Sequence, residues 1–224
     1  MAQPASVSTT LLRNVPLFAV LGEAQLSVLV RMIMRNRFGR NETIIGAGDS
    51  TDSLFIVING RLKVLMQDEQ GREVILAILG PGEFFGEMGL LDDSPRSASV
   101  VTLEPCELLS IAKTDFKRCL AENSDLSLMV MRGLVKRLRE ADQKIGSLAL
   151  MDVYGRVARL LLEMADEVGG EKIVVKKLSK QDIAKMIGAS REMVSRVMKD
   201  LQLGGYIEVR GRSIVLRDNI LVAE

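Results

Sequence analysis

Short apolar runs separated by turn signals fill the chain between residues 38 and 111, and this pattern limits the possible folds more than any other feature. The runs LFIVI (54–58), LKVLM (62–66) and VILAIL (74–79) have the length of strands. The turn signals around them are Gly48-Asp49, Asn59-Gly60, Gln70-Gly71 and Gly80-Pro81-Gly82. Strands this short and this often interrupted predict a sandwich or barrel-like roll, and the pair Asn59-Gly60 predicts a hairpin.

Helical spacing flanks the β-rich segment on both sides. Leu11 to Met32 shows this spacing first, and Pro16 interrupts it, so we expect short helices packed on the sheet. Residues 114–148 are helical again. After them, Asp152 is a candidate N-cap for a helix that we expect to run as far as Gly169-Gly170. The boundary between domains is expected just before that N-cap.

A narrow apolar stripe follows the second helical segment at alternating intervals of four and three residues. Its members are Leu134, Leu138, Ala141, Ile145 and Leu148. This spacing predicts a coiled-coil seam of about two heptads. The alternative is an amphipathic helix that lies on its own domain. A long helix after a β-roll, with so narrow a stripe, favours a two-fold homodimer.

Composition sets further limits on the class of protein. The 224 residues suggest one or two domains, and a hydrophobic content of 47% is enough for substantial cores. We find no apolar run long enough to span a membrane and no secretory signal at the N-terminus. Cys106 and Cys119 are the only cysteines and do not form a CxxC motif, so we expect reduced thiols in the cytoplasm.

The absence of histidine argues against several kinds of active site. It removes a histidine-based catalytic triad, most zinc sites and an axial histidine for haem. Two cysteines cannot supply the four thiolates of a typical iron–sulfur cluster. We therefore expect no enzyme activity, no metal, no haem and no iron–sulfur cluster. The formal charge of +1 means that any surface for nucleic acid must come from local clustering of charge.

Residues 82–100, GEFFGEMGLLDDSPRSASV, contain the groups that an anion site needs. The glycines in it let backbone N–H groups approach a ligand closely. Arg96 offers a planar fork of donors that suits a phosphate, and Glu87 offers an acceptor for a sugar hydroxyl. One cation for a phosphate and one carboxylate for a ribose predict a nucleotide site. The alternative is a glycine-rich corner of the roll with a surface arginine.

This segment resembles the phosphate-binding cassette of cyclic-nucleotide-binding domains. Gly86 and Glu87 match its Gly-Glu, in which the glutamate holds the ribose 2′-hydroxyl. Arg96, Ser97 and Ala98 match its Arg-Ser/Ala-Ala end, where the arginine and nearby N–H and hydroxyl groups hold the cyclic phosphate. The resemblance implies a cyclic nucleotide as ligand. The ligand residues that it implies, two of them on the central helix, are Gly86, Glu87, Met88, Arg96, Ser97, Ala98, Ala141 and Asp142.

Residues 178–201, LSKQDIAKMIGASREMVSRVMKDL, have the pattern of a helix-turn-helix. Ser179 and Asp182 open one short helix with a spacing like that of a capping box. Gly188 permits a tight turn, and Ser190 can cap a second helix. The apolar faces of the two helices are formed by Ile183, Ala184, Ile187, Val194, Val197, Met198 and Leu201.

The charges of this unit favour DNA over a protein as its partner. Arg191 lies in the first turn of the second helix, where the helix dipole disfavours a cation. Contact with phosphates or guanine edges in a major groove would offset this cost. Between residues 179 and 217 there are eight Lys or Arg and four Asp or Glu, which makes a basic patch. A hairpin around Arg210-Gly211-Arg212 is expected to follow as a wing. The alternative is a solvated three-helix module that docks a protein.

The helix-turn-helix is similar to that of the catabolite activator (Crp/Fnr) family of bacterial transcription regulators. The Ser-Arg-Glu-x-Val-x-Arg signature of that family falls on Ser190, Arg191, Glu192, Val194 and Arg196. The resemblance implies half-sites like TGTGA, contacted by Arg191, Glu192 and Arg196, while Met193 replaces the threonine that is common there. The DNA-contacting residues so implied are Ser179, Gln181, Ser190, Arg191, Glu192, Met193, Ser195, Arg196 and Lys199.

The cassette, the central helix and the recognition helix follow one another in the order found in this family, and the resemblance covers about residues 12 to 217. It implies an α+β fold with an N-terminal antiparallel β-roll over 11–113, a dimerisation helix and hinge over 114–150 and a C-terminal winged helix-turn-helix over 151–224. It further implies a homodimeric, cytoplasmic regulator that binds double-stranded DNA and RNA polymerase but no membrane. A regulator of the same fold that works without an effector is the alternative.

Two residues of the central helix depart from the cAMP-responsive members of the family. Those members carry a Thr-Ser pair that meets the adenine, whereas this chain has Ala141 and Asp142. An ionised aspartate only accepts hydrogen bonds, so Asp142 would match the paired donors of a guanine edge better than adenine. We rank cAMP first as effector and keep cGMP and cyclic di-GMP as alternatives. Asp142 as a solvated charge beside the seam is the other interpretation.

Overall fold

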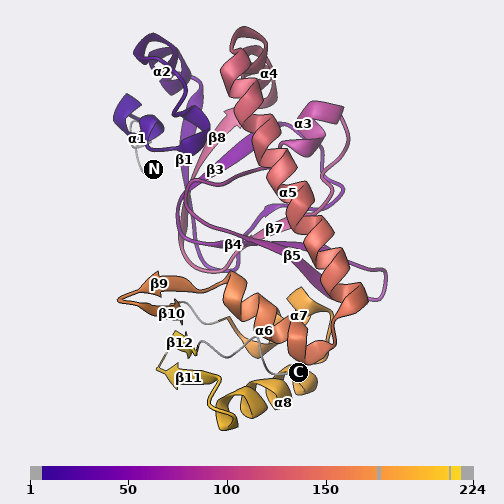
Figure 1. The fold of residues 1–224 in the computed structure, drawn as a ribbon. Helices are drawn as coiled ribbons and strands as arrows, with labels where there is room; N and C mark the ends of the chain where they lie inside the picture. The colour runs from indigo at the N-terminus through magenta and orange to yellow at the C-terminus, as the bar shows by residue number, and fades with distance from the viewer. Residues whose placement is uncertain (1–6, 176–177, 212, 218–224) are drawn as a thin grey trace. The chain divides into compact units, whose positions relative to one another are not determined.

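A computed structural model of the chain describes residues 7–175, 178–211 and 213–217 (Figure 1). The chain forms two compact units. The N-terminal unit extends to Arg137 and the C-terminal unit begins at Leu138. The division falls inside α5 (Ser124–Leu150), a helix of 27 residues that contributes to both units.

The strands described in the N-terminal unit form two four-stranded antiparallel sheets. The first sheet has the order β1 (Ile33–Phe38), β8 (Cys106–Ala112), β3 (Ser53–Asn59) and β6 (Phe84–Phe85). The second has the order β2 (Thr43–Ile45), β7 (Ser99–Thr102), β4 (Leu62–Gln67) and β5 (Glu73–Leu79). The antiparallel β-roll predicted from the sequence is confirmed.

Two apolar cores explain why the strands are so rich in apolar residues. One core receives residues from both sheets, among them Val57, Leu62, Phe85, Val100 and Leu108. The other core contains residues of the first sheet that point the opposite way, such as Leu54, Ile56, Leu109 and Ile111. Since alternate residues of a strand point to opposite faces, β3 is buried on both faces and its apolar run LFIVI is continuous.

The helices of the N-terminal unit supply the rest of the second core. They are α1 (Thr9–Arg13), the 3-10 helix η1 (Pro16–Phe18), α2 (Glu23–Val30), α3 (Met88–Asp92), α4 (Lys113–Glu122) and the first half of α5. In Figure 1, α1 and α2 lie together beside the end of the roll. Leu12, Leu26 and Phe116 are fully buried members of this core. The short helices predicted between residues 11 and 32, interrupted at Pro16, are confirmed.

Asn59-Gly60 does not form the predicted hairpin, because β3 and β4 belong to different sheets. The pair turns the chain from one sheet into the other. Gly60 has a φ of 90°, and a Cβ there would lie 2.5 Å from Cys106 Sγ. A sheet corner therefore requires the same positive φ that a tight hairpin requires, and the dipeptide alone does not distinguish the two. The signal at Gln70-Gly71 does mark a hairpin, between β4 and β5.

The helical segment predicted over 114–148 is divided into two helices. Asn123 lies between α4 and α5 with an extended backbone, at φ −137° and ψ 97°. Its side-chain amide donates to the Cys119 carbonyl at 2.9 Å, and the Ser127 hydroxyl donates to the Leu120 carbonyl at 2.9 Å. These bonds satisfy carbonyl groups that the end of α4 leaves without a helical partner. No proline or glycine marks the break in the sequence.

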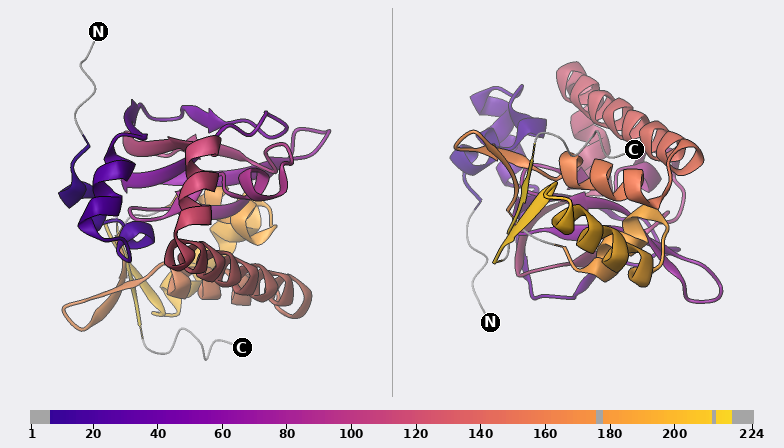
Figure 2. Two further views of the ribbon diagram at one scale, coloured as in Figure 1. Left: turned by 90° about the horizontal axis from the view of Figure 1, so that it is seen from above. Right: turned by 60° about the horizontal axis from the view of Figure 1, so that its bottom comes forward.

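Among the described residues after α5, the C-terminal unit combines three helices with a small antiparallel sheet. The helices are α6 (Val153–Glu163), α7 (Lys180–Ile187) and α8 (Arg191–Leu203). The sheet has the order β11 (Ile207–Arg210), β12 (Ser213–Leu216), β10 (Glu171–Val174) and β9 (Asp166–Val168). Figure 2 shows the strands to one side of the three helices. The predicted winged helix-turn-helix is confirmed, although Arg212 of the predicted wing lies outside the described residues.

The helix after Asp152 is shorter than predicted. Asp152 does cap it, since its carboxylate accepts from the Gly155 N–H at 2.8 Å. The helix ends at Glu163, and Gly169-Gly170 instead forms the turn of the β9–β10 hairpin with φ values of 61° and 81°. Gly-Gly suits a two-residue hairpin as well as a helix end, and the exposed charged strand β9 gives no strand pattern.

α5 ends at Leu150, two residues before the N-cap Asp152 of α6. The three domain ranges inferred from the sequence stay predictions. None of the helices that the structure describes has the length and apolar character that a membrane span requires.

Candidate functional site

The cassette residues lie between β6 and β7 in the N-terminal unit. Gly86 follows β6, Glu87 precedes the short helix α3 (Met88–Asp92), and Arg96 lies just before β7. Glu87 is 1% exposed and Arg96 is 6% exposed, although both carry charge. Ala98 is buried, whereas Ser97 and Met88 are exposed and in contact through the Ser97 hydroxyl and the Met88 sulfur, 3.8 Å apart. The two charged side chains predicted to bind the ligand, Glu87 and Arg96, are therefore buried in the protein.

The guanidinium of Arg96 is held mainly by backbone carbonyls. It donates to Gly86 O and to Ser53 O, each at 2.7 Å. Its ion pair is with Asp52, at 3.5 Å, and that carboxylate is 81% exposed to solvent. Burial lowers the pKa of Arg96, and the field of Asp52 only partly opposes this effect. A buried cation whose carboxylate partner is distant and solvated would gain from an anion beside it.

Gly86 is required at this site for two reasons. Its φ of 84° lies in the left-handed region that disfavours other residues. In addition, a Cβ at Gly86 would lie 2.4 Å from Arg96 Nη1 and 3.2 Å from the Ser53 carbonyl oxygen. The glycine that the motif predicted for close ligand approach therefore also lets the arginine reach its place.

Arg137 of α5 is a site residue that the sequence analysis did not single out. Its Nη1 donates to Glu87 Oε1 at 2.5 Å, and its Nη2 donates to the Phe84 carbonyl. The guanidinium carbon lies 4.8 Å from the centroid of the Phe84 ring. Gly133, one turn earlier, lets the helix approach, since a Cβ there would lie 2.8 Å from Phe84 Cζ.

A signal for Arg137 exists in the sequence. It follows Leu126, Val130 and Gly133 at helical spacing, so it belongs to the face of α5 that packs on the roll. Arg137 is also adjacent to Leu138 of the apolar stripe, and a charged residue next to such a stripe is usually solvated. Charge alone does not decide exposure, because an arginine is readily buried when a carboxylate accepts its hydrogen bonds.

The donors and acceptors of the cassette fit a cyclic nucleotide. Arg96 and the backbone around Gly86 suit a cyclic phosphate, and the buried carboxylate of Glu87 suits a ribose hydroxyl. Ala141 and Asp142 are exposed and belong to the C-terminal unit, so their place beside the cassette stays a prediction. In the parts of the chain that the structure describes, no three His, Cys, Asp or Glu side chains gather where they could hold a metal ion.

The residues predicted for the dimer seam differ in their surroundings. Leu138, Ile145 and Leu148 are 63%, 64% and 54% exposed, and Ala141 is exposed as well. Leu134 instead is half-buried and packs against the core of the N-terminal unit. At Leu134, therefore, α5 packs on its own domain, as expected from the alternative interpretation of the stripe as an amphipathic helix.

The helix-turn-helix has the caps that its sequence predicts. The Ser179 hydroxyl accepts from the Asp182 N–H at 3.0 Å and donates to the Asp182 carboxylate at 2.6 Å. Gly188 ends α7 in the left-handed conformation at φ 64°. The Ser190 hydroxyl accepts from the Met193 N–H at 3.1 Å and so starts α8. Both serines thus have a structural task in addition to the DNA contacts predicted for them.

One face of α8 is buried and the other is exposed and charged. The exposed predicted DNA residues are Arg191, Glu192, Met193, Arg196 and Lys199, with Gln181 exposed on α7. Ser195 is half-buried, and its hydroxyl accepts from Lys180 Nζ at 2.7 Å. Arg156 of α6 donates to the Ile187 carbonyl at 2.8 Å, which fixes the end of α7. Neither Lys180 nor Arg156 was predicted, because both contacts join different helices.

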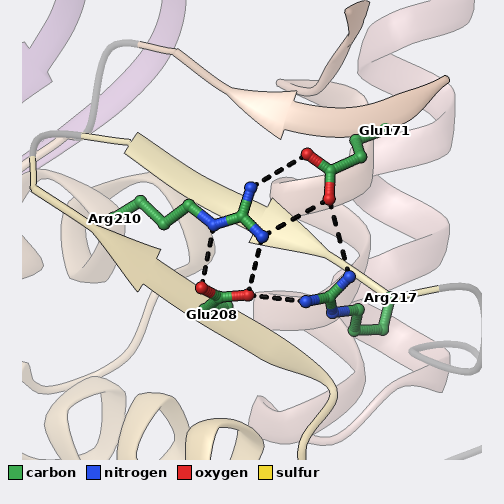
Figure 3. A network of polar contacts seen from close by, with 4 residues as sticks. All are labelled: Glu171, Glu208, Arg210 and Arg217. Carbon is green, nitrogen blue, oxygen red and sulfur yellow. Dashed lines mark hydrogen bonds and ion pairs between the residues drawn. The ribbon is translucent and has the colours of Figure 1, made fainter. Parts of the chain in front are cut away.

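Two arginines of the predicted basic patch are paired within the protein (Figure 3). Arg210 donates to Glu208 at 2.8 Å and to Glu171 at 2.9 Å. Arg217 pairs with Glu208 at 2.5 Å and with Glu171 at 3.6 Å. The two carboxylates raise the pKa of Arg210, and hydrogen bonds from Arg210 first, with help from Arg217, lower that of Glu208. The charges of Arg210 and Arg217 are therefore compensated within the protein.

Comparison with known proteins decides the family. A family model of cyclic nucleotide-binding domains matches residues 35–123, and one of Crp-like helix-turn-helix domains matches residues 155–219. The cAMP-activated global transcriptional regulator Vfr of Pseudomonas aeruginosa is 36% identical over 81% of this chain and 88% of its own length. This chain belongs to the Crp family of transcription regulators. The Crp family consists of regulators and not of enzymes, as the sequence predicted.

Other relatives of this Crp-family chain are similar over nearly its full length. A CRP-like cAMP-activated global transcriptional regulator of Mycobacterium tuberculosis is 30% identical over 93% of this chain and 95% of its own. Among solved structures, the c-di-GMP responsive global regulator CLP of Xanthomonas campestris is 29% identical. It has a TM-score of 0.73 and covers 87% of this chain and 99% of its own. The comparisons thus support a nucleotide-binding roll joined to a DNA-binding domain.

Proposed function

We propose that the chain is a homodimeric, sequence-specific DNA-binding transcription regulator gated by a cyclic nucleotide, with cAMP as the first candidate. Several relatives that are cAMP-activated by name support this choice. The proposal includes palindromic sites with TGTGA-like halves and contact with RNA polymerase. It places the protein in the cytoplasm, where a bacterial regulator meets its DNA.

The observation that carries the proposal is the state of Arg96. Its side chain is 4% exposed, and its carboxylate partner Asp52 lies 3.5 Å away in solvent. A cyclic phosphate would place a negative charge beside a cation that has already lost its water. Because the guanidinium is fixed by two backbone carbonyls, little side-chain entropy remains to be lost on binding.

We propose that Glu87 binds the ribose and that, through its ion pair with Arg137, it links ligand binding to α5. The carboxylate is buried and already bonded by Arg137 of α5. A ligand hydroxyl that donates to Glu87 therefore acts on the same carboxylate as the central helix. The nucleotide can shift a conformational equilibrium only as far as its affinity differs between the two states, and this shared carboxylate offers one source of such a difference.

DNA recognition is proposed to use the exposed face of α8. Arg191 and Arg196 can each bind a guanine edge with two hydrogen bonds, and Glu192 can accept from a cytosine amino group. A two-fold dimer would present two such helices to half-sites about one helical turn of DNA apart. Arg210 of the wing adds little positive charge, because it is paired with Glu171 and Glu208.

A guanine nucleotide is the second candidate effector. Asp142 is exposed on α5, where it could only accept hydrogen bonds when ionised. The N1–H and 2-amino groups of guanine form the paired donors that such a carboxylate prefers. The Xanthomonas relative is c-di-GMP responsive by name, so a guanine effector occurs among structures similar to this chain.

Calorimetric titration with cAMP, cGMP and cyclic di-GMP tests the nucleotide site. We expect saturable binding of one nucleotide by the wild type and none by Arg96→Ala. Arg72→Ala, in the exposed β4–β5 turn, is the control and should bind normally. Asp142→Ser should change the base preference if a guanine nucleotide is the effector. Absence of binding by all three nucleotides would overturn nucleotide gating.

Fluorescence anisotropy with a palindromic TGTGA duplex tests the DNA part separately. Arg191→Ala and Arg196→Ala should each lose about 1–3 kcal/mol of specific binding. Equal affinity of the wild type for this duplex and for a scrambled one would contradict the proposed half-sites. Strong specific binding without nucleotide, unchanged in Arg96→Ala, would instead favour a regulator that needs no effector.

A further inference from the structure

The exposed side of α5 carries an apolar series at intervals of seven residues. Met131, Leu138 and Ile145 are 53%, 63% and 64% exposed. Ala141 and Leu148 follow the last two after three residues and are exposed as well. In heptad notation the first three residues occupy position a, and the other two occupy position d. This is the register in which the second half of α5 would meet a second copy of itself.

The register places two opposite charges on the flanks of the seam. Arg137 directly precedes an a residue and so occupies position g, whereas Asp142 directly follows a d residue and occupies position e. The two positions lie five residues apart. In a parallel helix pair, g of one helix approaches the next e of the other, and such positions commonly hold interhelical ion pairs. Asp142 is exposed, and the Arg137 side chain is 32% exposed, so both are open to a partner.

An alternative register would place Asp142 in the middle of the seam. In that register the seam consists of Val135, Leu138, Asp142, Ile145 and Ala149. Asp142 then lies opposite its own copy across the two-fold axis. Like charges that face each other directly are destabilising, and a charged a residue costs stability. The register with Arg137 and Asp142 on the flanks brings opposite charges together instead. Charge complementarity therefore favours a second copy of this chain in that register.

Arg137 has a second carboxylate partner within its own protomer. Its Nη1 donates to Glu87, and its Nη2 donates to the Phe84 carbonyl. A guanidinium carries five N–H donors, so it can bind two carboxylates at once, as Arg210 does with Glu171 and Glu208 in this chain.

We propose that Arg137 binds Glu87 of its own protomer and Asp142 of the partner subunit, so that the nucleotide site and the dimer seam share one cation. This inference rests on the proposed function, because it takes the dimer to form through α5. A ligand hydroxyl that bonds Glu87 changes how strongly Arg137 is drawn toward its own site. By linkage, dimerisation and nucleotide binding then change each other's affinity by the same factor.

Sedimentation velocity without nucleotide measures the dimer dissociation constant of the wild type, Asp142→Asn, Arg137→Gln and the double variant. The ion pair occurs twice in a two-fold dimer, so Asp142→Asn should weaken association about two- to thirty-fold at low salt. The double variant should be no weaker than Arg137→Gln. High salt should reduce the effect of Asp142→Asn. Asp142→Glu should keep most of the affinity, and Arg139→Gln, an exposed arginine off the seam, is the matched control.

Because Arg137→Gln also removes the partner of a buried glutamate, Asp142→Arg serves as a second variant, which leaves the pair between Arg137 and Glu87 in place. It should weaken the dimer more than Asp142→Asn in the presence of Arg137, and circular dichroism confirms that each variant folds. Tighter association of Asp142→Asn, or equal constants for all variants, would overturn the ion pair.

The remaining outcomes separate this proposal from its neighbours. A changed nucleotide preference of Asp142→Asn with an unchanged dimer constant would assign Asp142 to the base and overturn the ion pair. Additive losses in the double variant would do so too. A wild type that stays monomeric at every concentration would refute the proposed dimer itself.

Discussion

Arg137 and Glu87 form an ion pair between α5 and the cassette, with Nη1 2.5 Å from Oε1 and the Glu87 side chain 2% exposed. The pair links residues fifty positions apart in the chain. The same guanidinium lies over the Phe84 ring, so one side chain satisfies a buried carboxylate and covers an aromatic residue. The first half of α5 is thereby attached to the cassette by charge as well as by apolar packing.

Arg137→Gln should lower the free energy of unfolding by about 1–3 kcal/mol, as measured by urea denaturation. Removing one partner of a buried ion pair costs about 3–5 kcal/mol, and we reduce this figure because Arg137 is about one-third exposed. Arg132→Gln, an exposed arginine on the same helix, should change stability by less than about 0.5 kcal/mol. Equal stabilities of the two variants would contradict a structural role for the pair.

The parts of the fold that the sequence predicted well depend on local chemistry. The caps at Ser179 and Ser190 and the turn at Gly188 form from residues close together in the chain, so spacing alone predicts them. The β-roll follows from the length of the apolar runs. For the cassette, the motif was enough to single out Glu87 and Arg96 as candidate site residues. It did not predict that both charged side chains are buried.

The parts that the sequence did not predict depend on contacts between distant segments. Asn59-Gly60 suits a hairpin and a sheet corner equally, and only the strand order distinguishes them. Arg137 was overlooked because its partner Glu87 comes from another segment. The charged strand β9 pairs with β10 although its residues are exposed and lack alternation. Local patterns cannot contain this information, because tertiary contacts decide between alternatives of similar local energy.

Gly86→Ala should destabilise the protein by about 2–5 kcal/mol and abolish nucleotide binding. The backbone cost at positive φ is about 1–2 kcal/mol, and the clash with Arg96 adds the cost of overpacking. Gly48→Ala is a matched control, because Gly48 has nearly the same φ of 86° but no atom within 4 Å of the added Cβ. Thermal unfolding and calorimetry of both variants measure the difference. Equal losses of stability in the two variants would mean that Arg96 accommodates the added Cβ without cost, contrary to this prediction.

Arg210→Ala should change the salt dependence of DNA binding much less than Lys199→Ala. Arg210 is paired with Glu171 and Glu208, so its charge is already compensated, whereas Lys199 is exposed on α8 and is predicted to contact DNA without reading a base. Removal of one cation that binds a phosphate lowers the slope of log affinity against log salt by about 1. Anisotropy titrations at four salt concentrations measure these slopes. A slope change in Arg210→Ala as large as that in Lys199→Ala would show that the wing arginine leaves its carboxylates to bind DNA.

Asp93→Asn should destabilise the protein at pH 6 but not near pH 2, as measured by urea midpoints. Lys113 at 2.7 Å and Lys117 at 2.8 Å lower the pKa of Asp93 from 3.8 to about 2. A carboxylate with a lowered pKa in the folded state contributes stability that is fully present above pH 3.8 and is lost as the pH falls through 2. Asparagine tolerates the left-handed backbone at φ 60°, so the substitution removes the charge without adding strain. In a variant that lacks both lysine charges, Asp93→Asn should have no further effect, and a deficit that persists unchanged at pH 2 would show that the charge is not its cause.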